Sequence, residues 1–191
     1  MSSPAPRRAL QQRVAAAILE GAARTLAVRG DQASMNEVAA AAGVARATVY
    51  RYFPNRQALL DELAHLAVED AHARLESARI DEVSATEGVA RAVRAFVEVG
   101  DSFVVLSRGP ARPGREEFEH KLAGPLRRLV ENGQSSGEIR DDVPSSWLTE
   151  SLVGLVVSVR ATSPALGRED TIASITSLFL EGAGAGGPRS T

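Results

Sequence analysis

The 191-residue chain has no cysteine and a single lysine, and only 4% of its residues are aromatic. The lack of cysteine excludes disulfides, thiolate metal sites and cysteine nucleophiles. No apolar run approaches the roughly 20 residues that a membrane-spanning helix needs. The first nine residues, MSSPAPRRA, lack the apolar stretch of a secretion signal. We therefore expect a soluble, cytoplasmic protein with no membrane partner.

The sequence also lacks the motifs of common catalytic and cofactor sites. It has no glycine-rich phosphate loop and no Ser/His/Asp pattern that spacing would support. His65, Glu69 and His72 share one face of a predicted helix and are residue types that bind metals. That face lies opposite the leucine stripe, where charges are simply solvated, so we assign no catalytic residue, no cofactor and no metal. An all-helical enzyme that uses His65 or His72 is a remote alternative.

The charges of the chain are divided unevenly. Residues 1–60 carry eight arginines and three acids, a net charge of +5. Residues 61–191 carry 14 bases and 21 acids, a net charge of −7. A basic head joined to an acidic body favours nucleic-acid binding by the head, because DNA would repel the body.

Apolar residues recur at helical spacing along most of the chain, which predicts an all-α fold of about nine helices. Residues 1–9 and 183–191 are predicted to be a disordered arm and a disordered tail. Between them we expect a three-helix N-terminal head, residues 10–57, and a helical body, residues 58–182.

Four helices of this prediction matter most. The first is expected over residues 10–28, and a long one over residues 56–78 joins the head to the body. The last two are expected over residues 144–162 and 169–181. Gly124-Pro125 should kink or split the helical stretch in which it lies.

Residues 34–60, SMNEVAAAAGVARATVYRYFPNRQALL, predict two short helices around a glycine turn. Ser34 and Glu37 have the spacing of a capping box at the start of the first helix. Gly43 permits the sharp turn. The second helix, about residues 45–53, carries arginine, hydroxyl and tyrosine groups within two turns. This arrangement is what insertion into a DNA major groove requires.

The side chains of this motif suggest distinct roles at a DNA duplex. Arg46 and Arg51 could each read a guanine edge or bind phosphate. Arg46, near the helix N-terminus, is the better candidate for base reading, and Ala47 could contact a thymine methyl. The hydroxyl groups and the other arginines would bind phosphates. Tyr50 and Tyr52 could instead be packing residues, and Ser34 could act as a cap alone. The predicted DNA-binding residues are Ser34, Arg46, Ala47, Thr48, Tyr50, Arg51, Tyr52 and Arg56.

Taken together, residues 34–60 resemble the helix-turn-helix signature of the TetR (tetracycline-repressor-like) family of bacterial regulators. The resemblance rests on Ser34, Val38-Ala39, Ala42-Gly43-Val44, Ala47-Thr48-Val49-Tyr50, Tyr52-Phe53, Asn55-Arg56 and Leu59-Leu60. Three positions differ from the commonest pattern, since Ala45, Ala47 and Arg56 stand where serine, glycine and lysine are frequent. These differences put the base preference in doubt.

The resemblance implies a homodimer with a three-helix DNA-binding head and a body that usually binds a small molecule. It also implies that the last two helices form the dimer interface as a four-helix bundle. The large apolar groups available for a ligand pocket are Phe96, Phe103, Leu106, Phe118, Leu122 and Trp147. The residues predicted for the dimer interface are Leu148, Leu152, Leu155, Val156, Val159, Ile172, Ile175 and Phe179.

The sequence therefore predicts a transcriptional repressor that binds double-stranded DNA and has no enzymatic activity. A small-molecule ligand would release it from a palindromic operator. A ligand-independent regulator or an activator of the same fold would share every feature of the head and stays open as the alternative.

Overall fold

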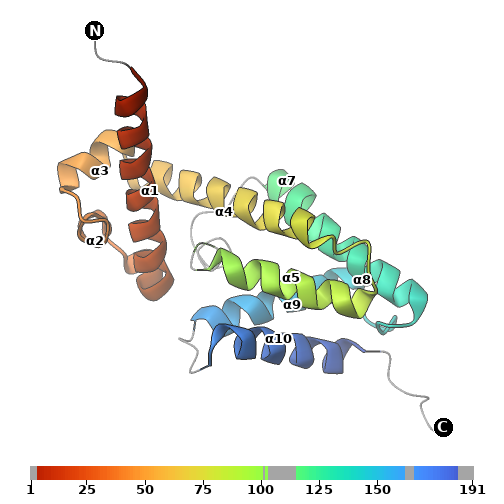
Figure 1. The fold of residues 1–191 in the computed structure, drawn as a ribbon. Helices are drawn as coiled ribbons and strands as arrows, with labels where there is room; N and C mark the ends of the chain where they lie inside the picture. The colour runs from red at the N-terminus through yellow and green to blue at the C-terminus, as the bar shows by residue number, and fades with distance from the viewer. Residues whose placement is uncertain (1–3, 101, 103–114, 162–165, 185–191) are drawn as a thin grey trace.

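The computed structural model describes residues 4–100, 102, 115–161 and 166–184. These residues form an all-α fold, as predicted, and contain no β-strand beyond a single bridge between Ile139 and Gly184. A small head at one end is joined by one long helix to a larger helical body (Figure 1).

The head contains three helices and a short connecting turn. Gly43, with a φ of +67°, makes the turn between the two short helices, as the sequence predicts. The buried residues Ile18, Val38 and Val49, one from each helix, form the centre of the head. The elements are α1 (Pro4–Arg29), η1 (Gly30–Gln32), α2 (Met35–Ala41) and α3 (Arg46–Tyr52).

The predicted disordered arm over residues 1–9 is wrong from Pro4 onward, because α1 already begins there. Proline is favoured in the first turn of a helix, where its fixed φ fits and its missing N–H costs nothing. The alanine, arginine, leucine and glutamine residues that follow are strong helix formers. Local propensity therefore extends α1 beyond the residues that pack against the head.

Close packing of α1 on α2 fixes the geometry of the head. Gly21 of α1 lies so near the end of α2 that a Cβ there would stand 2.8 Å from the backbone nitrogen of Ala42. Arg24 also donates a hydrogen bond of 2.9 Å to the carbonyl of Ala41. The two helices can approach this closely because no side chain separates them at Gly21.

The long helix α4 (Arg56–Ala78) has the predicted bounds and belongs to both parts of the molecule. Asn55 caps it by accepting a hydrogen bond from the N–H of Ala58. Its first buried residues pack in the head against α1, and its later ones pack in the body against α5 and η2. The helix passes the predicted domain boundary after residue 57 without a break (Figure 1).

The body is a bundle in which α5 lies centrally and packs against α4, α8, α9 and α10. The helical stretch around Gly124-Pro125 is not split: the π-helical residues Glu119–Ala123 run directly into α8, which starts at Gly124. The body elements are α5 (Ala85–Val99), α7 (Arg115–Phe118), η2 (Glu119–Ala123), α8 (Gly124–Ser136), α9 (Ser145–Ala161) and α10 (Arg168–Ala183). The predicted disordered tail, residues 183–191, is wrong at Ala183, the buried last residue of α10, and at Gly184, which bridges to Ile139. Its later residues lie outside the described ones.

The structure corrects the prediction of the dimer-interface residues. Most of them are buried in the core of the single chain, so they cannot supply a surface for a partner. Leu155 and Val159 are half-buried. Helical periodicity identified the face of α9 and α10 that meets the chain's own body, not the face that points outward. The buried residues are Leu148, Leu152, Val156, Ile172, Ile175 and Phe179.

The predicted pocket residues that the structure describes differ in their burial. Phe96 and Leu122 are fully buried among the core residues, and Phe118 is half-buried. Trp147 is 68% exposed on the outer face of α9, so its assignment to an enclosed pocket is wrong. A tryptophan at the first turn of a helix can point either way, and its size alone suggested an interior position. Phe103 and Leu106 lie outside the described residues.

The contact at Gly21 gives a test of the head packing. Replacing a helical glycine with alanine ordinarily stabilises a helix by about 1 kcal/mol. In Gly21→Ala the new methyl would meet the backbone of α2, and overpacking of this kind costs about 1–3 kcal/mol. We expect a net loss in the free energy of unfolding, measured by chemical denaturation. Glu20→Ala, at an exposed neighbour, should change it by less than about 0.5 kcal/mol. A more stable Gly21→Ala protein would contradict this packing.

Candidate nucleic-acid interface

A complete capping box starts α2. The Ser34 hydroxyl oxygen accepts a hydrogen bond of 3.3 Å from the N–H of Glu37. The Glu37 carboxylate in turn accepts from the N–H and the hydroxyl of Ser34, both at 2.8 Å. Glu37 also pairs with Arg29 at the end of α1. The box predicted from the sequence is confirmed, and within it the Ser34 hydroxyl donates one hydrogen bond and accepts one.

Helix α3 rests on the head through one face only. Val49 is fully buried and Phe53, directly after the helix, is nearly so. Thr48 and Tyr52 are half-buried at the edges of this contact. Ala45 precedes the helix in an extended conformation and gives no side-chain cap. The exposed residues of α3 are Arg46, Ala47, Tyr50 and Arg51.

Two arginines of α3 lie on tyrosine rings. The guanidinium of Arg46 is 5.3 Å from the centre of the Tyr50 ring and 3.4 Å from its hydroxyl oxygen. The guanidinium of Arg51 is 5.5 Å from the centre of the Tyr52 ring. Exposed cation–π contacts contribute only about 0.5–1 kcal/mol. They therefore orient the arginine side chains on the surface of α3, and a stronger partner such as phosphate could displace these ring contacts.

The surface around α3 is cationic because acids are missing from its sequence. Between Glu37 and Asp61 the chain has three arginines and no acidic residue. Glu37 is engaged with Arg29 and Ser34, and Asp61 accepts a hydrogen bond from Gln57. An exposed helix with unneutralised arginines and hydroxyl groups suits a polyanionic partner.

Arg56 differs from the other predicted DNA-binding residues because its guanidinium is turned into the head. It donates hydrogen bonds to the carbonyl of Ala33 and, at 3.2 Å, to the carbonyl of Asp31. Ala33 is buried, so its carbonyl needs this partner. Arg56 thus fastens the start of α4 to the segment that precedes α2. The sequence showed the charge of Arg56 but not the carbonyls that it meets.

The candidate metal-binding face of α4 is occupied by an ammonium group. His65, Glu69 and Glu117 bring their ligand atoms within 4.8 Å of one another, whereas His72 turns to Glu76 and the carbonyl of Lys121. Lys121 donates to the carboxylates of both Glu69 and Glu117. Hydrogen bonding to these carboxylates raises the pKa of Lys121, and Lys121 lowers the pKa of Glu117. The cluster joins α4 to η2 and α7.

Comparison with known proteins identifies the family to which the chain belongs. Residues 18–63 match the family described as bacterial regulatory proteins of the tetR family. Over 147 residues the chain is 34% identical to the HTH-type transcriptional repressor LfrR of Mycolicibacterium smegmatis, and the match covers 77% of each protein. The chain belongs to the TetR family.

Solved structures agree with the TetR fold. The crystal structure of LfrR from Mycobacterium smegmatis in complex with proflavine has a TM-score of 0.70 at 23% identity, and the match covers 91% of this chain and 97% of that one. The crystal structure of AibR in complex with isovaleryl coenzyme A and operator DNA has a TM-score of 0.67 at 20% identity, covering 86% of this chain and 97% of AibR.

The TetR family consists of DNA-binding transcriptional regulators, and this chain is therefore a DNA-binding transcriptional regulator. Within the described residues, none of the helices combines the length and the apolar character that crossing a bilayer would need. The eight residues predicted to contact DNA all lie in the head. Four of them are exposed on α3, whereas Ser34 and Arg56 are held by partners within the head.

The contacts of Arg56 predict a positioning role in this TetR-family head. Arg56→Ala would remove two charge-assisted hydrogen bonds and leave the buried Ala33 carbonyl without its donor. We expect unfolding to become easier by about 1–3 kcal/mol, with weaker DNA binding as a consequence. The slope of log K against log salt should stay as in the wild type. Gln57→Ala, next to it and exposed, is the control. If stability is unchanged while the slope falls by about 0.9, Arg56 is a phosphate contact instead.

Proposed function

We propose that this TetR-family protein is a homodimeric repressor that binds a palindromic operator and leaves it when a small molecule binds the body. The observation that carries this proposal is the exposed cationic face of α3. The buried residue of α3 is Val49, which anchors the helix to the head. Two such heads would enter successive major grooves, about 34–36 Å apart.

The residues of the head have different proposed roles. Arg46, in the first turn of α3, would leave the Tyr50 ring and read a guanine edge, with Ala47 beside it for a thymine methyl. Thr48, Arg51 and the two tyrosines would bind phosphates. Ser34 would act through the capping box and Arg56 through its carbonyl contacts, so both would position the interface rather than bind the duplex.

The outward face of α9 and α10 is the proposed dimer surface. Trp147 and Gly154 are exposed on α9, and Leu178, 59% exposed, lies on α10. A Cβ on Gly154 would meet no atom within 4 Å, so the chain leaves room for a helix to come close there. Exposed apolar groups beside small residues support a helix-on-helix contact between two copies.

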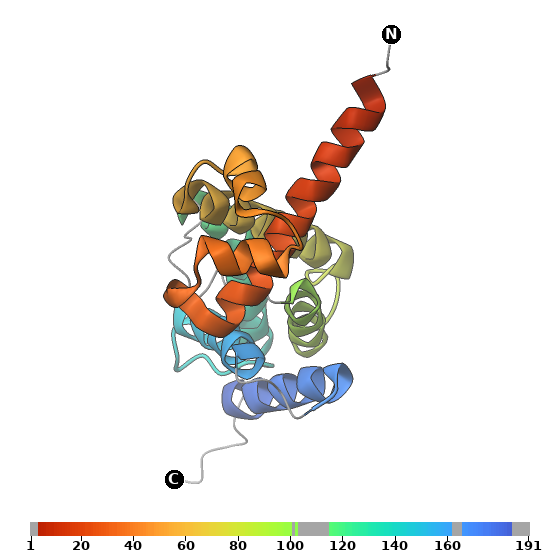
Figure 2. The same cartoon turned by 90° about the vertical axis from the view of Figure 1, so that its left-hand side faces the viewer.

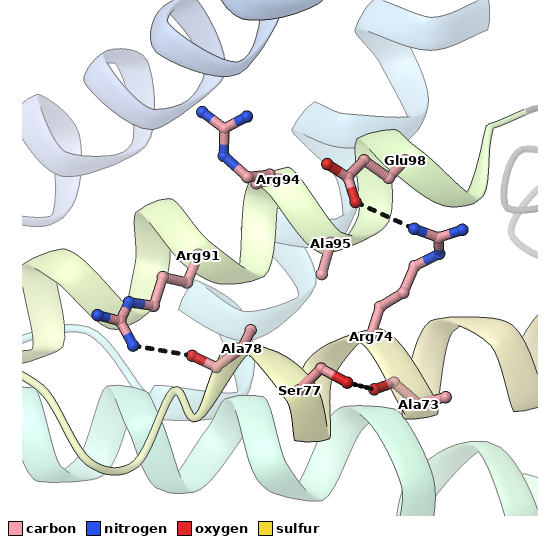
Figure 3. A pocket seen from close by; sticks show the side chains of 8 residues that line it. All are labelled: Ala73, Arg74, Ser77, Ala78, Arg91, Arg94, Ala95 and Glu98. Carbon is pink, nitrogen blue, oxygen red and sulfur yellow. Dashed lines mark hydrogen bonds and ion pairs between the residues drawn. The ribbon is translucent and has the colours of Figure 1, made fainter.

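The proposed mechanism is a population shift carried by α4. Beside its contact with α5, the body half of α4 lines an open surface groove of about 550 Å³ together with α5 (Figure 3). Arg74 of α4 pairs with Glu98 of α5 at 3.0 Å, and Arg94 of α5 makes a bidentate pair with Glu169 of α10. α5 is thus tied to the head-bearing helix on one side and to the proposed dimer helix on the other.

The energies support a switch that a ligand can drive. The Arg74–Glu98 pair is partly exposed, and exposed ion pairs contribute about 0–1 kcal/mol. Moving a two-state equilibrium from 1:99 to 99:1 takes about 5.5 kcal/mol of differential binding. A small molecule that favours a shifted α4 could supply this difference. The solved complexes of LfrR with proflavine and of AibR with isovaleryl coenzyme A and operator DNA support the proposal that the ligand is a small organic molecule.

The proposal includes no enzymatic activity. His65, the candidate catalytic group on α4, contacts Glu117 at 3.2 Å. His72 contacts the carbonyl of Lys121. Both histidines thus join α4 to its neighbours, a role that needs no substrate. Turnover of any compound that disappears in His65→Ala/His72→Ala would favour the enzyme instead.

Selection of bound fragments from genomic DNA tests the function. Wild-type protein should retain fragments that share one palindrome, and a reporter behind it should be silenced by the protein. Arg46→Ala should relax preference at one base pair per half-site by about 1–3 kcal/mol. Arg51→Ala, the matched control, should weaken binding to all sequences alike. Equal, sequence-blind losses would contradict the division of roles, and a reporter that the protein switches on would make it an activator.

The dimer surface has its own test. Leu178→Glu would place an unpaired carboxylate in the interface twice, and loss of the leucine alone removes about 1.5–3 kcal/mol per copy. We expect the dimer dissociation constant, measured by analytical ultracentrifugation, to rise at least about a hundredfold. Operator binding should fall with it. Leu66→Glu, at an exposed leucine of α4, should leave the dimer intact. A fully dimeric Leu178→Glu protein would place the interface elsewhere.

A further inference from the structure

The N-terminal extension of α1, residues 4–13, projects beyond the rest of the head. Residues 8–13 are all exposed, including Leu10 at 62%, and the first fully buried residue of the helix is Ile18. Figures 1 and 2 show the helix leaving the head as a free rod. At 1.5 Å per residue, the stretch from Pro4 to Val14 is about 15 Å long.

This extension carries positive charge and no negative charge. The first acidic residue of the chain is Glu20, and arginines stand at positions 7, 8 and 13 before it. Within the described part of the chain, Arg8 and Arg13 make no hydrogen bond and no ion pair. Further along the same helix, by contrast, Arg24 bonds the Ala41 carbonyl and Arg29 pairs with Glu37.

The direction of the extension is fixed relative to the recognition helix. The same rigid helix continues into the contact between Gly21 and the end of α2. Arg24 and Arg29 add polar ties from α1 to both ends of α2, and α2 packs on α3. The extension therefore points along one line from the helix-turn-helix rather than sampling all directions as a flexible arm would.

We propose that residues 4–13 bind the phosphate backbone of DNA next to the half-site that α3 contacts, without reading its sequence. The proposal rests on the proposed DNA-binding function and adds a second contact region to it. Charge complementarity identifies the partner, since exposed arginines with no counter-charge suit a polyanion. The length of about 15 Å is enough to pass from a major groove about 12 Å wide to an adjoining backbone.

The proposal predicts how strongly DNA binding should depend on salt concentration. Each phosphate that a cation neutralises steepens log K against log salt by about 0.9. Two such arginine–phosphate pairs would make binding fall about tenfold further between 50 and 200 mM salt. Because the arginines would bind the backbone, the effect should be equal on operator and on unrelated duplex of the same length.

The test compares full-length wild type with Arg8→Ala/Arg13→Ala on a duplex with long flanks and on one trimmed to the palindrome. The variant should have a slope smaller by about 0.9 for each phosphate that it no longer neutralises. Trimming should weaken the wild type more than the variant, which keeps only Arg7 of the three arginines. Arg8→Lys/Arg13→Lys should keep the wild-type slope. Arg128→Ala, at an exposed arginine of α8, is the matched control.

The outcomes separate this proposal from the function on which it rests. If wild-type protein retains no genomic fragment, the proposed function fails. If it binds an operator but the double variant has the wild-type slope and the same response to trimming, only the role of the extension fails. An effect confined to the operator sequence would also overturn it, since the extension would then read bases. Equal thermal unfolding of variant and wild type would confirm that both are folded.

Discussion

The functional geometry depends on the packing of α4 in two places at once. Leu59, Leu60 and Leu63 are buried at its head end, and Ala71 and Leu75 are buried in the body. Each fully buried leucine stabilises its contact by about 1.5–3 kcal/mol. Because one unbroken helix carries both sets, the head cannot turn relative to the body without disturbing one of these contacts.

The polar contacts along α4 act differently from its packing. Lys121 and Arg74 connect it to η2 and α5 through side chains that are between about a quarter and a half exposed. Ion pairs of this kind are weak and depend on geometry. They can therefore select among closely related positions of α4 while the buried leucines and alanines keep it attached. This division suits a regulator, since a ligand needs to overcome only the weaker set.

Local signals predicted the parts of the fold that depend on a few neighbouring residues. The capping box of Ser34 and Glu37, the turn at Gly43 and the start of α4 at Asn55 follow from chemistry within one or two helical turns. The positions of Gly21 and Arg56 did not follow from the sequence, because their importance lies in a backbone segment that is distant along the chain. Their partners, Ala42 and Ala33, carry no distinctive side chain that could have revealed them.

Periodicity failed at the dimer helices for a related reason. A stripe of apolar residues at helical spacing marks a face that must be covered, but it does not say by what. On α9 and α10 the strongest stripe, with Leu152 and Ile175, meets the chain's own body. The outward face is marked instead by isolated apolar groups and by Gly154, a weaker signal than a stripe. Trp147 was misplaced for a different reason, since its size alone suggested an interior position.

Helix α3 shows why the head has to move as a unit. It has seven residues and no side-chain cap, and isolated helices of that length are not stable in water. Its order therefore comes from Val49 and Phe53 in the head core. That core is closed by the Gly21 contact and by Arg56 at the start of α4. A shift of α4 thus carries Arg56 and the segment before α2 with it. Regulation through α4 would change where α3 stands on the duplex while its face stays intact.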